Sequence, residues 1–359
     1  MTARIYFDHA GSSPLRPCAR EAMLAAMDAV GNPSSVHAEG QAARAMIEQA
    51  RRDVAAFVNV RPEQVIFTSG GTEANNLALR GLGAHGGFVS AVEHDCVLKT
   101  GAALGFGVLP VDEQGVVREV EGVSKGALVS VMMANNETGV RQDIIRLAAA
   151  VRAAGGVFHT DAVQVVGHEP VDFAALGVDA LTFSGHKMGA PMGVGALIVR
   201  SELDFIPQMT GGAQERKRRA GTENVPAIAG LGAVVRELAE TGPAAWARMD
   251  VLAALLDEEL ARLPNVHVVA GDADKVSHIR QVRVPGKRGE DMVIAMDLHG
   301  VAVSQGSACG SGRVSSSHVL RAMGWDEAAA SEVVRLSLGW NTTPAEIVAA
   351  VAALKKVAG

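Results

Sequence analysis

In four places the chain has a short apolar run that ends in polar residues. Ligands of open α/β sheets bind at the carboxyl ends of the strands, so these are the positions where chemistry is expected. The first run, Val65–Thr68, is followed by Ser69-Gly70-Gly71-Thr72. A glycine turn that opens a helix exposes N–H groups at the positive end of the helix dipole, which favours binding of a phosphate. A tight turn in which Thr72 only caps the helix explains the same residues equally well.

Two further clusters supply a carboxylate and an amine. The run that starts at Val157 ends at Asp161, whose burial is costly unless it meets a positive partner such as a protonated pyridine nitrogen. A helix cap or a salt bridge is the ordinary alternative for Asp161. The run Leu181–Phe183 leads through Ser184 and His186 to Lys187. A desolvated lysine loses its proton readily, as a Schiff-base amine requires, and we favour this role over a solvent-facing lysine.

The fourth cluster carries a thiol. The run Val301–Val303 leads into a Gly/Ser-rich stretch, 304–312, that contains Cys309. Such a stretch is a poor place to bury a cysteine, so the sequence favours a reactive thiol over a small core residue. Cys18 and Cys96 lie in helix-like, apolar surroundings and are expected to be structural. The three wide-spaced cysteines fit neither a disulfide framework nor a self-contained zinc site, which predicts a cytoplasmic location.

A sheet covered by helices is needed to position these clusters. Buried-strand patterns alternate with amphipathic helical patterns through the first two thirds of the chain, which predicts a mainly parallel sheet. The expected strands are Val65–Thr68, Phe88–Val92, Ala127–Met133, Val157–Asp161, Ala180–Phe183 and Ala196–Arg200, and the expected helices include Thr72–Arg80 and Arg141–Ala154.

The pattern changes after Gly242-Pro243. The last third is expected to form a smaller α+β unit. Its predicted elements are a helix over Ala244–Arg262, strands at Val266–Val269 and Ile279–Val284, a helix near Glu290–His299 and a terminal helix over Thr343–Val357.

Composition excludes several classes of protein. The 33 Lys and Arg residues against 39 Asp and Glu give a net charge of −6, which argues against a nucleic-acid-binding face. No apolar run reaches the ~20 residues that cross a bilayer, and residues 1–14 lack a secretory pattern, so no membrane partner is expected.

Taken together, the motifs resemble those of the pyridoxal-phosphate-dependent cysteine desulfurases, in the class V branch of the aminotransferase-like enzymes, and within it the subgroup that serves iron–sulfur cluster assembly. The segments that carry the resemblance run nearly end to end: Tyr6–Asp8, Gly31–His37, Phe67–Asn76, Glu93-His94, Asn135–Gly139, Asp161–Gln164, Ser184–Lys187, Arg219–Asn224, Gly306–Cys309 and Arg335–Gly339.

The resemblance implies an α/β architecture of fold type I. It has a large pyridoxal-phosphate-binding domain, residues 15–243, with a mainly parallel seven-stranded sheet. Residues 1–14 and 244–359 form a small α+β domain that carries the cysteine loop. It also implies a homodimer.

The resemblance further implies a role for each site residue. Lys187 forms the Schiff base with pyridoxal 5′-phosphate and moves a proton, Asp161 pairs with the ring nitrogen, and His94 stacks on the ring and shuttles a proton. The resemblance implies that the phosphate is held by Gly71, Thr72, Ser184 and His186, with Thr222 from the second subunit. It implies that Gln164 bonds to the phenolic oxygen and that Asn136 contacts the cofactor. It also implies that Asn136 and Arg335 bind the substrate carboxylate, Arg335 through a bidentate clamp.

The implied reaction converts L-cysteine to L-alanine and leaves a persulfide on the nucleophile Cys309. The sulfur then passes to an acceptor or iron–sulfur scaffold protein. No intrinsic metal site is implied, although Cys309 is a candidate ligand of a cluster shared with such a scaffold. Selenocysteine lyase or cysteine-sulfinate desulfinase activity on the same scaffold, and a partner-gated sulfur-delivery protein, are the alternatives.

Three positions depart from the family pattern. His9 stands where the family has asparagine and is expected to alter the substrate entrance. Met192 replaces a customary lysine, so a positive charge is missing. Ser315-Ser316 replaces Glu-Pro, which predicts a change in loop stiffness or in the fit of the sulfur acceptor.

Overall fold

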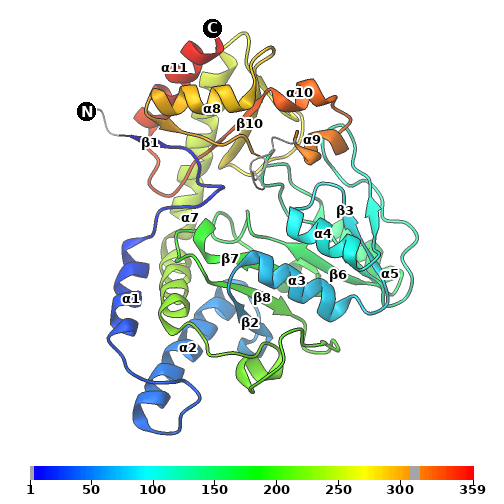
Figure 1. The fold of residues 1–359 in the computed structure, drawn as a ribbon, viewed down its shortest axis with the longest axis vertical. Coiled ribbons are helices and arrows are strands. Elements are labelled where there is room, and N and C mark those ends of the chain that lie inside the picture. The colour runs from blue at the N-terminus through cyan, green and yellow to red at the C-terminus, as the bar shows by residue number, and fades with distance from the viewer. Residues whose placement is uncertain (1–3, 307–315) are drawn as a thin grey trace.

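The computed structural model describes residues 4–306 and 316–359; Cys309 and Ser315 lie outside these ranges. Figure 1 shows two bodies, each built around its own sheet, with the long helix α7 (Val225–Ala261) running through both. The larger body contains a seven-stranded sheet, and the smaller one a three-stranded sheet and a two-stranded sheet. Among the described residues, no helix combines the length and apolar character needed to cross a membrane.

The seven-stranded sheet confirms the predicted α/β fold. Its strand order is β2-β8-β7-β6-β5-β3-β4, and β8 alone is antiparallel to its neighbours. The strands are β2 (Val65–Thr68), β3 (Gly87–Ser90), β4 (Gly107–Leu109), β5 (Leu128–Ser130), β6 (Val157–Asp161), β7 (Ala180–Ser184) and β8 (Gly195–Val199). Strand β4 is absent from the prediction, because a three-residue edge strand has too few residues to show a pattern.

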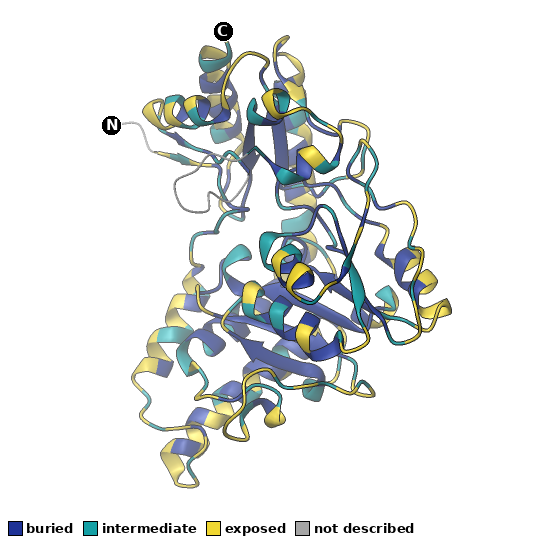
Figure 2. Ribbon diagram, turned by 45° about the vertical axis from the view of Figure 1, so that its right-hand side comes forward, coloured by how far each residue is buried: buried dark blue, intermediate teal, exposed yellow. Residues whose placement is uncertain are grey.

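Side chains of the sheet alternate between two apolar layers. Along β2, Val65 and Phe67 join the core beneath α2, α5 and α7, whereas Ile66 joins the core beneath α3 and α4. Such alternation is the period of a strand covered on both faces. Figure 2 shows the sheet as an almost wholly buried layer. The covering helices are α1 (Pro17–Met27), α2 (Ala38–Phe57), α3 (Gly71–Leu82), α4 (Asp95–Ala103), α5 (Ile144–Ala153) and α6 (Phe173–Leu176).

Helix α7 begins at Val225, so the predicted start at Ala244 is wrong. Pro243, after which the sequence pattern changes, lies inside the helix and removes one backbone N–H from its hydrogen bonding. The helix persists because both of its halves are packed. Its first half contacts α1 and α2, and its second half contacts α11 (Pro344–Ala358).

The smaller body joins the two ends of the chain. Strand β1 (Ile5–Tyr6) pairs in parallel with β11 (Val301–Ala302), and the three-stranded antiparallel sheet has the order β12-β10-β9. Its own apolar core includes Phe7, Leu256 and Leu336. The remaining elements are β9 (His267–Val268), β10 (Ile279–Arg283), β12 (Val333–Ser337), α8 (Gly289–Leu298), α9 (His318–Ala322) and α10 (Glu327–Ser331).

A buried ion pair ties the end of α2 to the segment before α7. Arg51 donates two hydrogen bonds of 2.8 Å to the Glu215 carboxylate, which also accepts the Phe67 N–H at 2.9 Å. Both charged residues are 4% exposed. Glu215 and the two residues after it, Arg216 and Lys217, have positive φ angles of 45°, 57° and 66°. These bonds therefore hold a strained backbone segment in place.

The Glu215→Ala variant should lose about 3–5 kcal/mol of unfolding free energy. It leaves the buried Arg51 guanidinium with Glu48, at 3.2 Å, as its remaining carboxylate partner and removes the acceptor of the Phe67 N–H. Urea unfolding followed by circular dichroism measures the change. Glu258→Ala is the matched control, since its pair with Arg262 is exposed and should contribute less than about 1 kcal/mol. Equal midpoints for the two variants would contradict the importance of the buried pair.

Candidate active site

One cavity of about 340 Å³ opens at the carboxyl ends of the central strands and reaches the smaller body. Ten of the residues predicted from the sequence line it together, although they come from six separate stretches of chain. They are Gly71, Thr72, His94, Asn136, Asp161, Gln164, Ser184, His186, Lys187 and Arg335. The carboxyl-end rule for open sheets thus locates most of the predicted site.

The start of α3 forms one end of the cavity. Gly70 has a φ of +149°, a conformation that favours glycine, and it turns the chain from β2 into the helix. Gly71 and Thr72 then present the first N–H groups of a twelve-residue helix to the cavity, beside Ser184. Glu73 fixes the turn by accepting the Ser69 N–H at 2.8 Å and pairing with Arg219. This end is suited to a phosphate.

Asp161 ends β6 as a buried carboxylate, 5% exposed. It accepts the Val163 N–H at 2.9 Å and the Asn75 amide at 2.6 Å, and forms no ion pair within the described ranges. Burial raises its pKa, while the charges of His94 and Lys187 act in the opposite direction. A cation in the cavity beside Asp161 would meet a carboxylate that is already desolvated.

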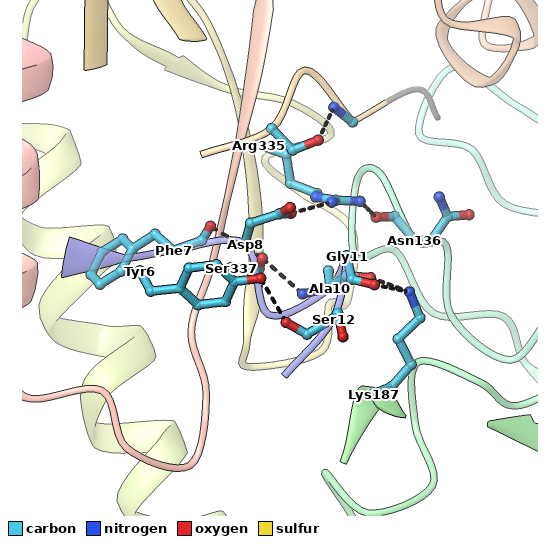
Figure 3. A network of polar contacts seen from close by, with 12 residues as sticks. Tyr6, Phe7, Asp8, Ala10, Gly11, Ser12, Asn136, Lys187, Arg335 and Ser337 are labelled. Atoms are coloured by element: carbon cyan, nitrogen blue, oxygen red, sulfur yellow. Dashed lines mark hydrogen bonds and ion pairs between the residues drawn. The ribbon is translucent and has the colours of Figure 1, made fainter. Parts of the chain in front are cut away.

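Lys187 follows β7 and points toward the segment after β1, as Figure 3 shows. Its Nζ donates to the carbonyl oxygens of Ala10 at 2.6 Å and Gly11 at 2.7 Å. Burial lowers the pKa of this amine to about 8, with a further lowering from the Arg335 charge. The amine therefore has a substantial neutral fraction near neutral pH, which nucleophilic attack on a carbonyl requires.

Arg335 on β12 reaches the cavity from the smaller body. Its guanidinium donates to Asp8 at 2.7 Å and to the carbonyl oxygen of Asn136 at 2.6 Å (Figure 3). The side chain is only 4% exposed, so the Asp8 carboxylate offsets a charge that burial would otherwise make costly. Arg335 is thus held in one orientation with its charge directed toward the cavity.

His94 lies beside a second thiol. It caps α4 by accepting the Cys96 N–H at Nδ1, 3.2 Å away, and the Cys96 Sγ is 3.0 Å from the same nitrogen. The Cys96 Sγ also lies 3.3 Å from the Asn75 amide, which in turn binds Asp161. Cys96 packs against the apolar core beneath α3 and α4, as expected, but it also lines the cavity among polar groups, which the sequence did not reveal. Burial raises its pKa to about 12, which keeps the thiol protonated.

Three other expectations concern positions away from this cavity. Thr222 is exposed and lines a separate cavity with Ser69 and Arg219, so its contact with a cofactor stays a prediction. Cys309 lies outside the described residues. The expectation that His9 alters the substrate entrance is wrong, because His9 is 1% exposed and packs against Gly339.

Sequence reasoning missed three polar residues of the cavity wall: Asp8, Asn75 and Cys96. Asn75 could have been found, because it lies three residues after Thr72 and so on the same face of α3. Asp8 lies in one of the segments that carry the resemblance, but no spacing links it to its partner Arg335, which is 327 residues further along the chain.

Comparison with known proteins agrees with this geometry. The model of the class-V aminotransferase family matches residues 5–349, and the chain belongs to this family. Similar proteins include a putative cysteine desulfurase IscS 1 of Bacillus subtilis, 37% identical over 363 residues that span 96% of each chain. An IscS-like cysteine desulfurase of Mycobacterium tuberculosis is also 37% identical, over 97% of this chain and 95% of its own. The solved NifS-like protein of Rickettsia africae superposes with a TM-score of 0.90 at 32% identity, over 99% of each chain.

Members of this family are enzymes that depend on pyridoxal 5′-phosphate, and the residues present fit that cofactor. The cavity has a helix start suited to a phosphate at one end and a buried carboxylate beside Asn75. It also has a side-chain oxygen, Gln164 Oε1, that has no hydrogen-bond partner among the described residues. A buried acceptor without a donor is costly, and the phenolic group of the cofactor would satisfy it.

Added pyridoxal 5′-phosphate should become attached to Lys187 of the cofactor-free protein, at a rate that rises with pH and levels off above about pH 8. The neutral amine is the reactive form, and its fraction grows until the pH passes the lowered pKa of about 8. Borohydride reduction and peptide mass mapping at each pH measure this rate. The urea-unfolded protein is the control. A rate that keeps rising tenfold per pH unit up to pH 10 would contradict the lowered pKa.

Proposed function

We propose that this enzyme is a cysteine desulfurase, which converts L-cysteine to L-alanine and transfers the sulfur as a persulfide. One observation carries the proposal: a single cavity gathers an amine of lowered pKa, a buried carboxylate and a fixed guanidinium, namely Lys187, Asp161 and Arg335. The names of the similar proteins support the same activity.

We assign the cofactor contacts as follows. Lys187 would bond to the aldehyde of pyridoxal 5′-phosphate, Asp161 would face its ring nitrogen, and Gln164 its phenolic oxygen. Gly71, Thr72, Ser184 and His186 would hold the phosphate, and Asn136 and His94 would contact the ring. When bound, the cofactor supplies an electron sink that stabilises negative charge at the substrate Cα.

The remaining work belongs to side chains of this chain. Arg335 binds the substrate carboxylate through N–H groups beside those held by Asp8 and Asn136, so the substrate enters in one orientation. The Lys187 amine, within reach of the cavity, removes the Cα proton and later returns one. His94 can exchange a proton through Nε2, because its Nδ1 already accepts the Cys96 N–H.

Cys309 is the proposed nucleophile. Its thiolate attacks the substrate sulfur, so that an S–S bond forms as the C–S bond breaks. The bond electrons remain with the substrate carbon, which takes up protons to become alanine. The sum of the reaction is L-cysteine plus a protein thiol giving L-alanine plus a protein persulfide. The terminal sulfur then passes to an acceptor protein, which we propose to be an iron–sulfur scaffold.

Two alternatives receive less support. Selenocysteine lyase or cysteine-sulfinate desulfinase activity needs Cys309 less, and the names of the similar proteins do not favour either activity. The names of the similar proteins also do not favour a sulfur-delivery protein in which a partner gates catalysis. We further propose a cytoplasmic location and the division into domains 15–243 and 1–14 with 244–359.

Incubation of the holoenzyme with L-cysteine should add one sulfur atom, about 32 Da, to the peptide that contains Cys309 and should release alanine. The Cys309→Ala variant should lose at least 100-fold in alanine formation, because no thiolate remains to accept the sulfur. Intact and peptide mass spectrometry with alanine quantification measure both. Cys18→Ala is the matched control and should retain activity. Alanine release by Cys309→Ala at the parent rate would refute the assigned nucleophile.

We also propose a homodimer in which Thr222 completes the phosphate site of the partner subunit. Lys187→Ala and Thr222→Ala dimers should each retain the cofactor poorly. Mixed dimers should regain one complete site, because one subunit then supplies Lys187 and the other supplies Thr222. Cofactor retention after co-refolding and gel filtration measures this effect. Mixed dimers that bind no better than either parent variant, or a fully active monomer, would contradict the proposal.

A further inference from the structure

The turn Asn135–Gly139, which follows β5, is fixed by its own first side chain. The Asn135 Oδ1 accepts the N–H groups of Glu137 and Thr138, both at 2.9 Å, and its Nδ2 donates to the Val92 carbonyl oxygen at 2.9 Å. The carbonyl oxygen of the next residue, Asn136, accepts a hydrogen bond from the Arg335 guanidinium. Because these hydrogen bonds hold the turn in one conformation, the turn can fix the position of groups that reach it from the smaller body.

Glu137 extends from this turn into a buried position, 1% exposed. Its Oε2 accepts the Ser317 hydroxyl at 2.5 Å, and the Ser317 oxygen in turn caps α9 by accepting the Leu320 N–H at 3.1 Å. A second bond reinforces this attachment, since His318 Nε2 donates to the Glu93 carbonyl oxygen at 2.9 Å. The start of α9 is therefore attached to the larger body by both Glu137 and Glu93.

Gly306, which immediately precedes the 307–315 range, also lies against Glu137. A Cβ placed on Gly306 would be 3.6 Å from the Glu137 Cβ and 2.8 Å from the Gln281 Nε2. Gly306 has a φ of +96°, so a side chain there would be disfavoured by both conformation and space. Two residues earlier, Ser304 pairs through its backbone with Arg335, at 2.6 Å from the Arg335 N–H.

We propose that Glu137 is a positioning residue that fixes Gly306 and Ser317, which flank the range containing Cys309, relative to the Arg335 clamp. The inference rests on the proposed function, because it has Glu137 fix the position of the Cys309 range relative to the substrate that Arg335 is proposed to bind. A buried carboxylate is costly, and a stabilising contact alone could be made by an apolar residue of similar size. The bond to Ser317 gives the carboxylate a directional role that an apolar residue cannot replace.

Four variants test the assignment in the holoenzyme. Glu137→Ala removes the acceptor for the Ser317 hydroxyl, whereas Glu137→Gln keeps an oxygen in the same place. Ser317→Ala removes the donor. Ser277→Ala is the matched control, because it deletes another hydroxyl–carboxylate bond, to Asp250, at 2.5 Å and outside the cavity.

Two readouts are measured: kcat and KM for alanine formation from L-cysteine, and the iodoacetamide alkylation rate of each cysteine by peptide mass spectrometry. Glu137→Ala should lower kcat at least tenfold with KM within threefold of the parent value, and Cys309 should alkylate at least threefold faster. Ser317→Ala should change both in the same directions, and Glu137→Gln and Ser277→Ala should stay within threefold of the parent.

Cys18 and Cys96 serve as internal controls for the fold, because burial raises their pKa values to about 11 and about 12. They should alkylate slowly in every folded variant. If they alkylate faster in Glu137→Ala, that variant has lost its fold, and Ser317→Ala decides the question. The proposal would be overturned if kcat and the Cys309 alkylation rate were unchanged in Glu137→Ala, or in Ser317→Ala where Glu137→Ala has lost its fold. A parent enzyme that forms no alanine would instead refute the desulfurase function, and the alkylation contrast would still test Glu137.

Discussion

Strand β6 ends in a buried carboxylate, Asp161, and the turn after β7 carries a partly buried amine, Lys187. These two groups do not pair with each other. Asp161 bonds to the Asn75 amide and a backbone N–H, and Lys187 bonds to two backbone carbonyl oxygens. Direct pairing would neutralise both groups and leave the cavity without reactivity. Burial raises the pKa of Asp161 and lowers that of Lys187, so it favours the neutral form of each group. Both groups therefore remain available to a ligand that enters the cavity.

The segment after β1 makes this separation possible. Residues Asp8 to Ser13 cross from the smaller body to the larger one and touch the site at several points. Asp8 holds Arg335, the carbonyl oxygens of Ala10 and Gly11 hold Lys187, and the Ala10 carbonyl also accepts the Gln164 amide at 3.1 Å. Figure 3 shows the bonds of this segment to Arg335 and to Lys187. A short N-terminal segment therefore aligns the groups proposed to bind substrate with those proposed to bind cofactor.

Much of the fold could be predicted from the sequence because its strands are continuous apolar runs that end in polar residues. Strands β2 and β6 have the predicted bounds, and the residues after them line the cavity as expected. The errors arise where tertiary packing overrides a local signal. Pro243 lies inside α7 because both halves of the helix are packed, and His9 is buried because Gly339 leaves room for its ring. The Asp8–Arg335 pair joins opposite ends of the chain, and no local pattern reveals it.

The central claim is that Asp161 is a buried carboxylate prepared for the protonated nitrogen of the cofactor ring. The most direct measurement compares the affinity of the cofactor-free protein for pyridoxal 5′-phosphate and for its 1-deaza analogue, which lacks that nitrogen. The parent protein should bind the analogue at least about 100-fold more weakly, or about 2.7 kcal/mol, and Asp161→Asn should remove most of this difference. Equal affinities for the two compounds in the parent protein would contradict the account.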